Sequence, residues 1–219
     1  DRAVSRLRAS FVANPTRVMA LPPAAAPRPE PAPEPVRWRS AGVAGAAEGA
    51  VLTVADGLDR CARITLGAGR AGRVMASDAR LALLQPEEPA GAALPAMLLA
   101  APVAPGTVVT LAGFGQGGDS VRATPVPARI EGQQGALLTL DASLLQGDGG
   151  GPVLTDTGAL AGLVMPGAPP RAVATPVLRE FLVHAGVLLA DAAPQAAPLT
   201  ALAQAQRAQM LTVAVTCWP

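Results

Sequence analysis

The sequence predicts an all-β domain, because short apolar segments alternate with turn residues along most of the chain. From Val36 to about Phe181, these segments are four to eight residues long and are separated by glycine, proline and aspartate. Segments of this length and turn density are typical of a β-sandwich or a β-barrel. They read AVLTVADG, ARITLGAG, GRVMASD, LALLQP, TVVTLAGFG, GALLTL, GGPVLTD and LAGLVMPG. With 219 residues, the chain is long enough to bury a sizeable core.

Two segments of different character precede this region. Residues 1–20 place Val4, Leu7 and Phe11 at helical spacing, which predicts a short N-terminal hook that is helical or extended. Residues 21–36 contain seven prolines and predict an extended polyproline II tether. Because so short a helix is marginal alone in water, we expect the apolar stripe of the hook to contact a protein partner, with a groove on its own barrel and a membrane interface as the alternatives.

Helical patterns return after the β-rich region. Residues 176–189, PVLREFLVHAGVLL, predict a helix, because Pro176 suits a first helical turn and apolar residues recur at helical spacing. Residues 191–219 then form a tail with an Ala/Pro linker, a helical stretch TALAQAQRAQML and an alternating strand LTVAVTCWP.

Composition excludes several classes of function. The net charge is +1 and no basic cluster with interleaved aromatic residues occurs, so we expect no nucleic-acid binding. The longest apolar run is broken by Pro95 and Pro102, so we expect no transmembrane span. With one histidine and two cysteines we expect no metal site, and we expect no cofactor. The chain begins at Asp1, which we take to indicate a removed signal peptide.

One turn, LQGDGGGPVL at residues 145–154, is rich enough in glycine to let another molecule approach the backbone. A phosphate-binding loop and an oxyanion-binding turn are the two functional interpretations, and a tight bend between strands is the structural one. The phosphate loop requires a lysine, a Ser or Thr and a following helix. Here Gly151 is followed by Pro152 and a predicted strand, so the oxyanion interpretation is favoured.

The turn GDGGGPVL resembles GDSGGPVL, the nucleophile turn of trypsin-like serine proteases. Other segments resemble the same family, especially its bacterial HtrA-type members, in the right order over about residues 40–185: AVLTVADG, SDARLALLQP, GTVVTLAGFGQG, GALAGLVMPG and AVATPVLREFL. The resemblance implies two six-stranded antiparallel β-barrels within residues 37–190. The first barrel would cover about 37–100 and the second about 101–175, followed by the helix 176–189.

The three positions that match the catalytic triad hold other residues. Gly149 stands at the serine, Asp56 at the histidine and Arg80 at the aspartate. Glycine offers no nucleophilic atom, and aspartate with an ordinary pKa of about 3.9 is a weak base at pH 7. We therefore predict that the chain is not an enzyme. His184 lies in the predicted final helix, after the turn, and is expected to have a structural or surface role.

The resemblance also implies which parts of a binding site remain. Gly147 and Gly149 match the oxyanion-hole amides, with Asp148 between them. Met165 and Gly167 match the strand that lines the substrate cleft. Ser143 matches the floor of the specificity pocket, and a plain turn serine is an equal alternative. A collapsed cleft is the alternative for the whole site.

Cys61 and Cys217 fall in or beside predicted strands. The HtrA-like resemblance implies the cell envelope, where thiols oxidise, so we favour a disulfide between them over two buried thiols and expect a periplasmic location.

Three functions remain open. We favour a pseudoprotease that acts as a protein-binding or structural accessory subunit of a periplasmic or membrane-associated bacterial complex, reached through the N-terminal segment. The second is a peptide-binding or chaperone-like module that uses the relict cleft. The third is an active serine-type hydrolase with an atypical site, which the residues at positions 56, 80 and 149 disfavour.

Overall fold

Twelve β-strands form the framework of the part of the chain that the structure describes. The structure is a computed structural model that describes residues 38–44, 49–88, 96–115, 122–193 and 196–218, all within the unit Glu34–Pro219. The predicted hook with Val4, Leu7 and Phe11, and the proline tether of residues 21–36, lie outside the described residues. Within the part that is described, no helix is long and apolar enough to cross a membrane.

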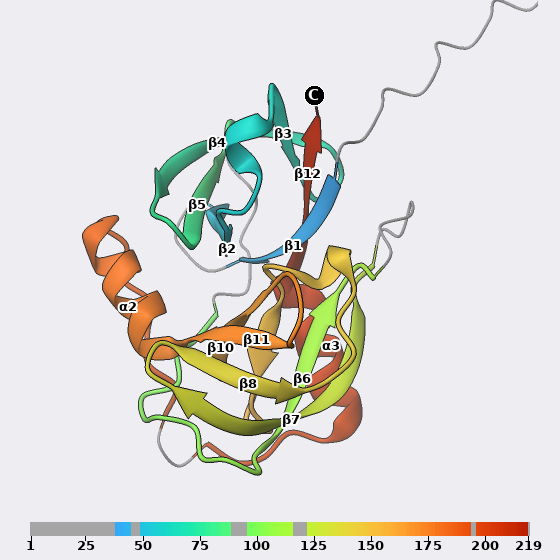
Figure 1. The fold of residues 1–219 in the computed structure, drawn as a ribbon, viewed down its shortest axis with the longest axis vertical. Coiled ribbons are helices and arrows are strands. Elements are labelled where there is room, and N and C mark those ends of the chain that lie inside the picture. Colours follow the sequence, from blue (N-terminus) through green and yellow to red (C-terminus); the bar gives the residue numbers. More distant parts are fainter. Residues whose placement is uncertain (1–37, 45–48, 89–95, 116–121, 194–195, 219) are drawn as a thin grey trace, which may run out of the picture. The chain divides into compact units, whose positions relative to one another are not determined.

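The strands close into two six-stranded antiparallel barrels, which confirms the predicted fold class (Figure 1). The first barrel has the order β1-β12-β3-β4-β5-β2. Its strands are β1 Trp38–Ala44, β2 Val51–Val54, β3 Arg63–Leu66, β4 Arg70–Ser77, β5 Leu81–Pro86 and β12 Thr212–Trp218.

The second barrel has the order β10-β11-β8-β7-β6-β9. Its strands are β6 Val108–Gly113, β7 Thr124–Gln134, β8 Leu137–Asp141, β9 Pro152–Leu154, β10 Leu160–Met165 and β11 Arg171–Ala174. One hydrophobic cluster contains residues of both barrels, among them Leu52 and Leu81 of the first and Leu154 and Leu163 of the second. This shared core holds the two barrels together.

Among the described residues, two α-helices and two 3₁₀ turns accompany the strands. The 3₁₀ turns are η2 Leu58–Arg60 and η3 Gln146–Asp148, and the helices are α2 Thr175–His184 and α3 Ala201–Leu211. The predicted helix 176–189 is therefore too long at its C-terminal end. It stops because Gly186, which lies just beyond it, has a φ of +73°, outside the helical region.

Helix α3 packs on the second barrel through side-chain hydrogen bonds to the β9–β10 turn. Gln204 Nε2 donates to the Thr155 carbonyl oxygen at 3.0 Å, and Arg207 Nε donates to the Gly158 carbonyl oxygen at 2.9 Å. Burial lowers the pKa of the Arg207 guanidinium from its usual value. These bonds set the position from which the chain enters β12.

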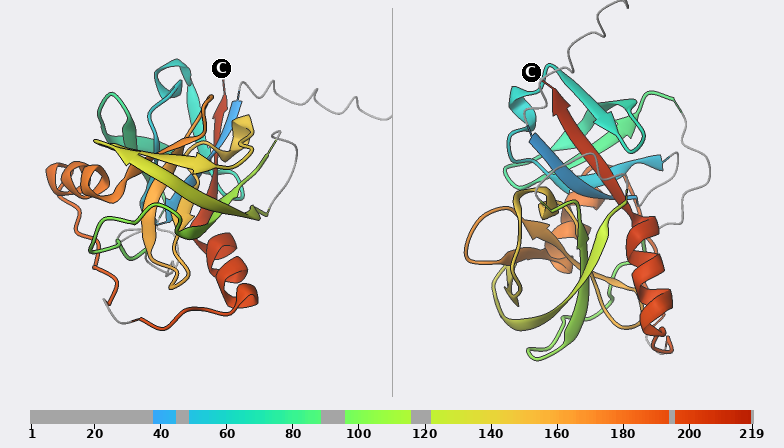
Figure 2. Two further views of the ribbon diagram at one scale, coloured as in Figure 1. Left: turned by 60° about the horizontal axis from the view of Figure 1, so that its bottom comes forward. Right: turned by 90° about the vertical axis from the view of Figure 1, so that its right-hand side faces the viewer.

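The C-terminal strand β12 is the sixth strand of the first barrel. It lies between β1 and β3, with Ala214 opposite Ala41 and Val215 opposite Leu66. Figure 2 shows α3 beside the second barrel leading directly into β12. The predicted boundary at residue 190, with a separate tail at 191–219, therefore differs from the structure. Residues 38–86 supply only five strands, and the closed barrel takes its sixth from the tail.

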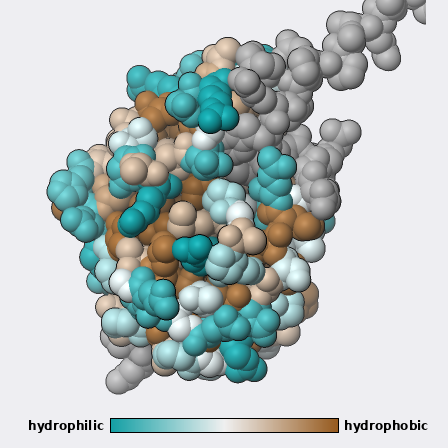
Figure 3. Space-filling model, viewed as in Figure 1, coloured by the Kyte–Doolittle hydropathy of each residue, from teal (hydrophilic) through white to brown (hydrophobic). Residues whose placement is uncertain are grey.

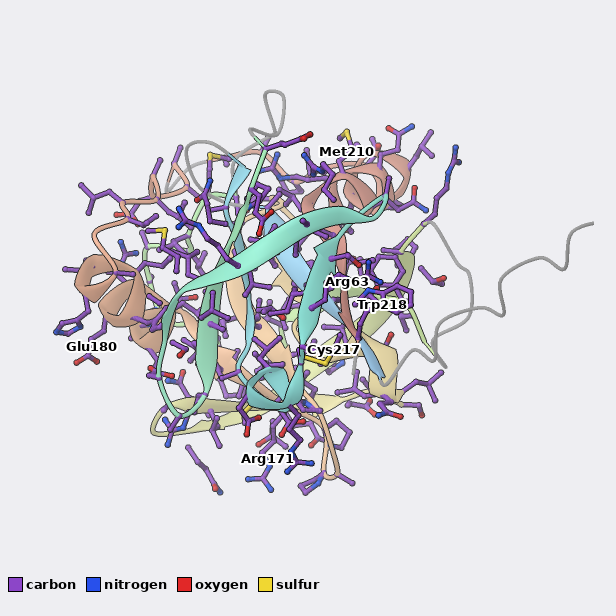
Figure 4. The ribbon with its side chains drawn as sticks, turned by 90° about the horizontal axis from the view of Figure 1, so that it is seen from above. Arg63, Arg171, Glu180, Met210, Cys217 and Trp218 are labelled. Carbon is purple, nitrogen blue, oxygen red and sulfur yellow. A yellow bond between two sulfur atoms is a disulfide. The ribbon has the colours of Figure 1, made fainter. Side chains whose placement is uncertain are left out.

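A disulfide between Cys61 and Cys217 attaches β12 to the segment before β3 (Figure 4). Next to it, Trp218 Nε1 donates to Thr65 Oγ1 at 3.0 Å, and the Arg63 guanidinium lies 4.7 Å from the centre of the Trp218 ring. The end of the chain is thus bound covalently and by side-chain contacts to the first barrel.

We expect reduction of this disulfide to lower the stability of the whole unit. The disulfide closes a loop of 156 residues. In the chain-entropy model, opening such a loop lowers the free energy of unfolding by up to about 5 kcal/mol, because the unfolded chain gains conformational freedom. Thermal unfolding followed by circular dichroism should show a lower Tm in the presence of a reductant. The matched control is the double variant Cys61→Ser/Cys217→Ser, whose Tm should not respond to reductant. Equal Tm values for the natural protein with and without reductant would contradict the expectation.

Candidate functional site

The turn between β8 and β9 is held in place by the carboxylate of Asp148. Its Oδ1 accepts a hydrogen bond from the Gly115 N–H and its Oδ2 accepts one from the Leu145 N–H, both at 2.9 Å. A side chain at Gly113 would overlap the Asp148 carboxylate. The aspartate of the motif therefore joins the turn to the end of β6.

The glycines after Asp148 let the same turn lie against the first barrel. Gly150 has a φ of +80°, and a Cβ there would overlap the Ala41 carbonyl oxygen and Thr53 Oγ1. The Ala41 N–H donates to the Gly149 carbonyl oxygen at 2.7 Å, and Thr53 Oγ1 donates to the Ala41 carbonyl oxygen at 2.6 Å. The close approach between β1 and this turn explains the run of glycines.

The predicted pair of oxyanion-binding amides is not assembled in this conformation. The Gly147 N–H donates to the Gly115 carbonyl oxygen at 2.7 Å and is therefore not available to a ligand. The cause is the 3₁₀ turn Gln146–Asp148, which directs this amide toward the chain that follows β6. The expectation that Gly147 and Gly149 would donate together thus differs from the structure.

Two of the three triad positions lie in one cavity between the barrels. Asp56 follows β2, Arg80 precedes β5, and both line a cavity of about 480 Å³ together with Met165 and Pro166 after β10. Gly149 does not line it, and a Cβ at this position would lie 3.3 Å from the Pro166 Cβ. Because residue 149 carries no hydroxyl, hydrolysis by this chain would need a different nucleophile.

Further polar residues line this inter-barrel cavity, namely Asp59, Ser77 and Asp78. Asp78 Oδ1 accepts the N–H groups of Arg80 and Leu81, each at 2.7 Å, so this carboxylate shapes the β4–β5 turn. No motif in the sequence marks Asp59 or Ser77 as a site residue, because only the fold of η2 and β4 brings them to the cavity that Asp56 lines. The cavity therefore presents side-chain charges of both signs.

The other predicted cleft residues are only partly brought together. Met165 lines the inter-barrel cavity, whereas Ser143 and Gly167 do not. His184 is exposed on α2, where its Nδ1 lies 2.8 Å from the Glu180 carbonyl oxygen. Among the residues that the structure describes, no three His, Cys, Asp or Glu side chains could hold a metal ion together.

Because the turn packs against β1, we expect alanine to destabilise the protein to different extents at two neighbouring glycines. Gly150→Ala places a side chain against Ala41 and Thr53 at a positive φ, so we expect it to destabilise the unit by at least about 2 kcal/mol. Gly149→Ala, at φ −55° and ψ 134°, should cost less than about 1 kcal/mol. Urea unfolding of both variants provides the measurement. Equal destabilisation would show that the turn does not lie against β1 as described.

Comparison with known proteins identifies the family. The model of the trypsin-like peptidase domain matches residues 40–163, which is more than half of the chain. No curated protein matches the chain. The resemblance drawn from the sequence motifs is therefore confirmed at the level of the family.

Solved structures show the same fold at low sequence identity. A serine-to-alanine mutant of Rv3671c from Mycobacterium tuberculosis, in an inactive form, is 23% identical with a TM-score of 0.57, covering 66% of this chain and 80% of its own. The Rv3671c protease in its inactive form is 21% identical with a TM-score of 0.56, covering 68% and 88%. A serine endoprotease from Yersinia pestis is 22% identical with a TM-score of 0.57, covering 68% and 58%.

These findings correct one expectation. The prediction that the chain is not an enzyme is contradicted by the match to the model of the trypsin-like peptidase domain, which points to a protease. The prediction weighed three positions by their chemistry alone, whereas the match extends over both barrels. By its two barrels and by the match over residues 40–163, this chain belongs to the trypsin-like peptidase family.

Proposed function

We propose that this chain binds polypeptide segments in the inter-barrel cavity and acts as a protein-binding accessory subunit of a larger assembly in the bacterial cell envelope. The observation that carries the proposal is the cavity of about 480 Å³, which both barrels line and in which Asp56, Arg80 and Met165 meet. A cleft of this size with an apolar lining and a few charged groups suits a peptide side chain and its neighbours.

We favour polypeptide binding over hydrolysis because of the side chains that line this cavity. It presents carboxylates and a guanidinium, and the residue in the nucleophile turn is Gly149. The Asp56 and Arg80 side chains make no hydrogen bond or ion pair with any other described residue, so both are free to contact a ligand. A chaperone-like module would use the same cavity in the same way.

Two features support the envelope assignment and the accessory role. The Cys61–Cys217 disulfide suits an oxidising compartment such as the periplasm. The apolar stripe of Val4, Leu7 and Phe11 is the segment that we propose for contact with the partner subunit. Peptide hydrolysis is the second candidate function, because the family is a family of peptidases.

Filling the cavity should abolish polypeptide binding. We expect fluorescently labelled casein, an unfolded polypeptide, to bind the full chain, with binding measured by fluorescence anisotropy. Met165→Trp should weaken it at least about tenfold, because the larger side chain occupies the cavity. Met210→Trp is the matched control, since Met210 is exposed on α3 (Figure 4), and it should leave binding unchanged.

The same samples distinguish the two candidate functions. Mass spectrometry of the casein, together with labelling by a serine-directed fluorophosphonate, detects hydrolysis. Casein cleavage that Met165→Trp abolishes and Met210→Trp retains would assign peptide hydrolysis to this cleft in place of simple binding. Binding that survives Met165→Trp, or the absence of both binding and cleavage, would overturn the proposal.

A further inference from the structure

A second cavity is lined by residues of α2 and of the turn between β4 and β5. Figure 1 shows where these elements lie in the fold. The volume of this second cavity is about 500 Å³. Besides a valine and two alanines, its lining consists of Ser77, Asp78, Arg80, Glu180, Phe181 and His184. The space-filling view shows hydrophobic residues in the middle of the face seen in Figure 1, bordered by hydrophilic residues (Figure 3).

Charges of both signs face this second cavity from two different elements. Arg80 and Asp78 belong to the β4–β5 turn, whereas Glu180 and His184 belong to α2. Within the described part of the chain, neither the Arg80 guanidinium nor the Glu180 carboxylate forms an ion pair. Both groups are therefore available to a ligand.

A neighbouring charged residue on α2 does form an ion pair. Arg179, the residue before Glu180, forms an ion pair with Asp191 and a hydrogen bond to the Leu99 carbonyl oxygen. Glu180, which is exposed, forms no such pair and lines the second cavity. Its carboxylate is therefore open to a ligand there.

One ring nitrogen of His184 is used by a backbone hydrogen bond. A carbonyl oxygen can only accept, so the Nδ1 that lies 2.8 Å from the Glu180 carbonyl oxygen carries the proton. This leaves Nε2 as the nitrogen that can bond to a ligand. Phe181, which is 7% exposed, and Val177 supply an apolar floor between the charged walls.

We propose that this second cavity binds a zwitterionic α-amino acid with an apolar side chain. The α-carboxylate pairs with Arg80, the α-ammonium group pairs with Glu180 and Asp78, and the side chain packs on Phe181. These side chains are exposed, so the gain comes from charge-assisted contacts: a ligand with a single charge pairs with one wall, whereas a zwitterion pairs with both. The volume falls in the range of small-molecule sites, about 300–1,000 Å³. The site goes beyond the proposed binding of polypeptide, although Ser77, Asp78 and Arg80 line both cavities.

The test uses the full chain and three probes of matched shape. Isothermal titration calorimetry should show saturable binding of L-leucine, with a Kd of about 1 mM or below. Two analogues each lack one charge: 3-methylbutylamine has no carboxylate and 4-methylpentanoate has no ammonium group. We expect each to bind at least about tenfold more weakly than leucine, because each loses one charge-assisted contact.

Variants on the two walls locate the site. Glu180→Gln and Arg80→Gln should each weaken leucine binding about tenfold or more. The matched controls are Glu131→Gln on β7 and Arg73→Gln on β4, which are exposed and line neither cavity, and they should bind leucine within about twofold of the natural chain. Glu180 does not line the inter-barrel cavity, so Glu180→Gln should bind casein normally. This separates failure of the leucine site from failure of polypeptide binding.

Three results would overturn the inference. The first is the absence of saturable leucine binding up to about 50 mM. The second is equal binding of leucine and either analogue, which would mean that only one charge is recognised. The third is unchanged leucine affinity in Glu180→Gln, with circular dichroism showing a folded protein.

Discussion

The contact between the glycine turn and β1 is the constraint on which the arrangement of this site depends. Gly150 passes so close to the Ala41 carbonyl oxygen and the Thr53 hydroxyl that no side chain fits, and the Ala41 N–H bonds to the Gly149 carbonyl oxygen at 2.7 Å. β1 belongs to the first barrel and the turn connects strands of the second. Through this contact and the shared core, loops from both barrels come to line one cavity.

The same turn decides which groups remain available for a ligand. Asp148 uses both carboxylate oxygens on backbone amides, and Gly147 donates its own amide to Gly115. Backbone donors are thereby used within the protein, and the polar groups left at the inter-barrel cavity are side chains such as Asp56 and Arg80. Recognition at this site therefore depends on side-chain charge.

The β4–β5 turn is also held by an aspartate, and it lies between the two cavities. Asp78 holds the turn by accepting two backbone N–H groups, and Ser77, Asp78 and Arg80 line both cavities. A short segment thus forms the wall between the inter-barrel cavity and the one beside α2. Arg80 lines both cavities, so its guanidinium is shared between them.

The local pattern of the sequence determined the strands and the turn chemistry, because alternation, glycine and proline act on the nearest neighbours in the chain. The motif GDGGGPVL was enough to point to the trypsin-like family, and the family model over residues 40–163 agrees with it. The same pattern predicted α2 but overran its end, because the effect of Gly186 depends on its backbone conformation.

Only the tertiary structure decided which segments meet. The alternating strand LTVAVTCWP was visible in the sequence, but its partners β1 and β3 lie more than a hundred residues earlier, and alternation alone does not specify a pairing partner. The same holds for the cavities. Asp59 and Ser77 join Asp56, and Glu180 joins Arg80, only after the barrel closes and α2 packs beside it. The hydrogen bond from the Gly147 N–H could not be predicted from the sequence either, because its acceptor, the Gly115 carbonyl oxygen, lies in a different loop. Strand pairing and loop contacts arise from packing over long chain separations, which is why the residue pattern alone could not supply them.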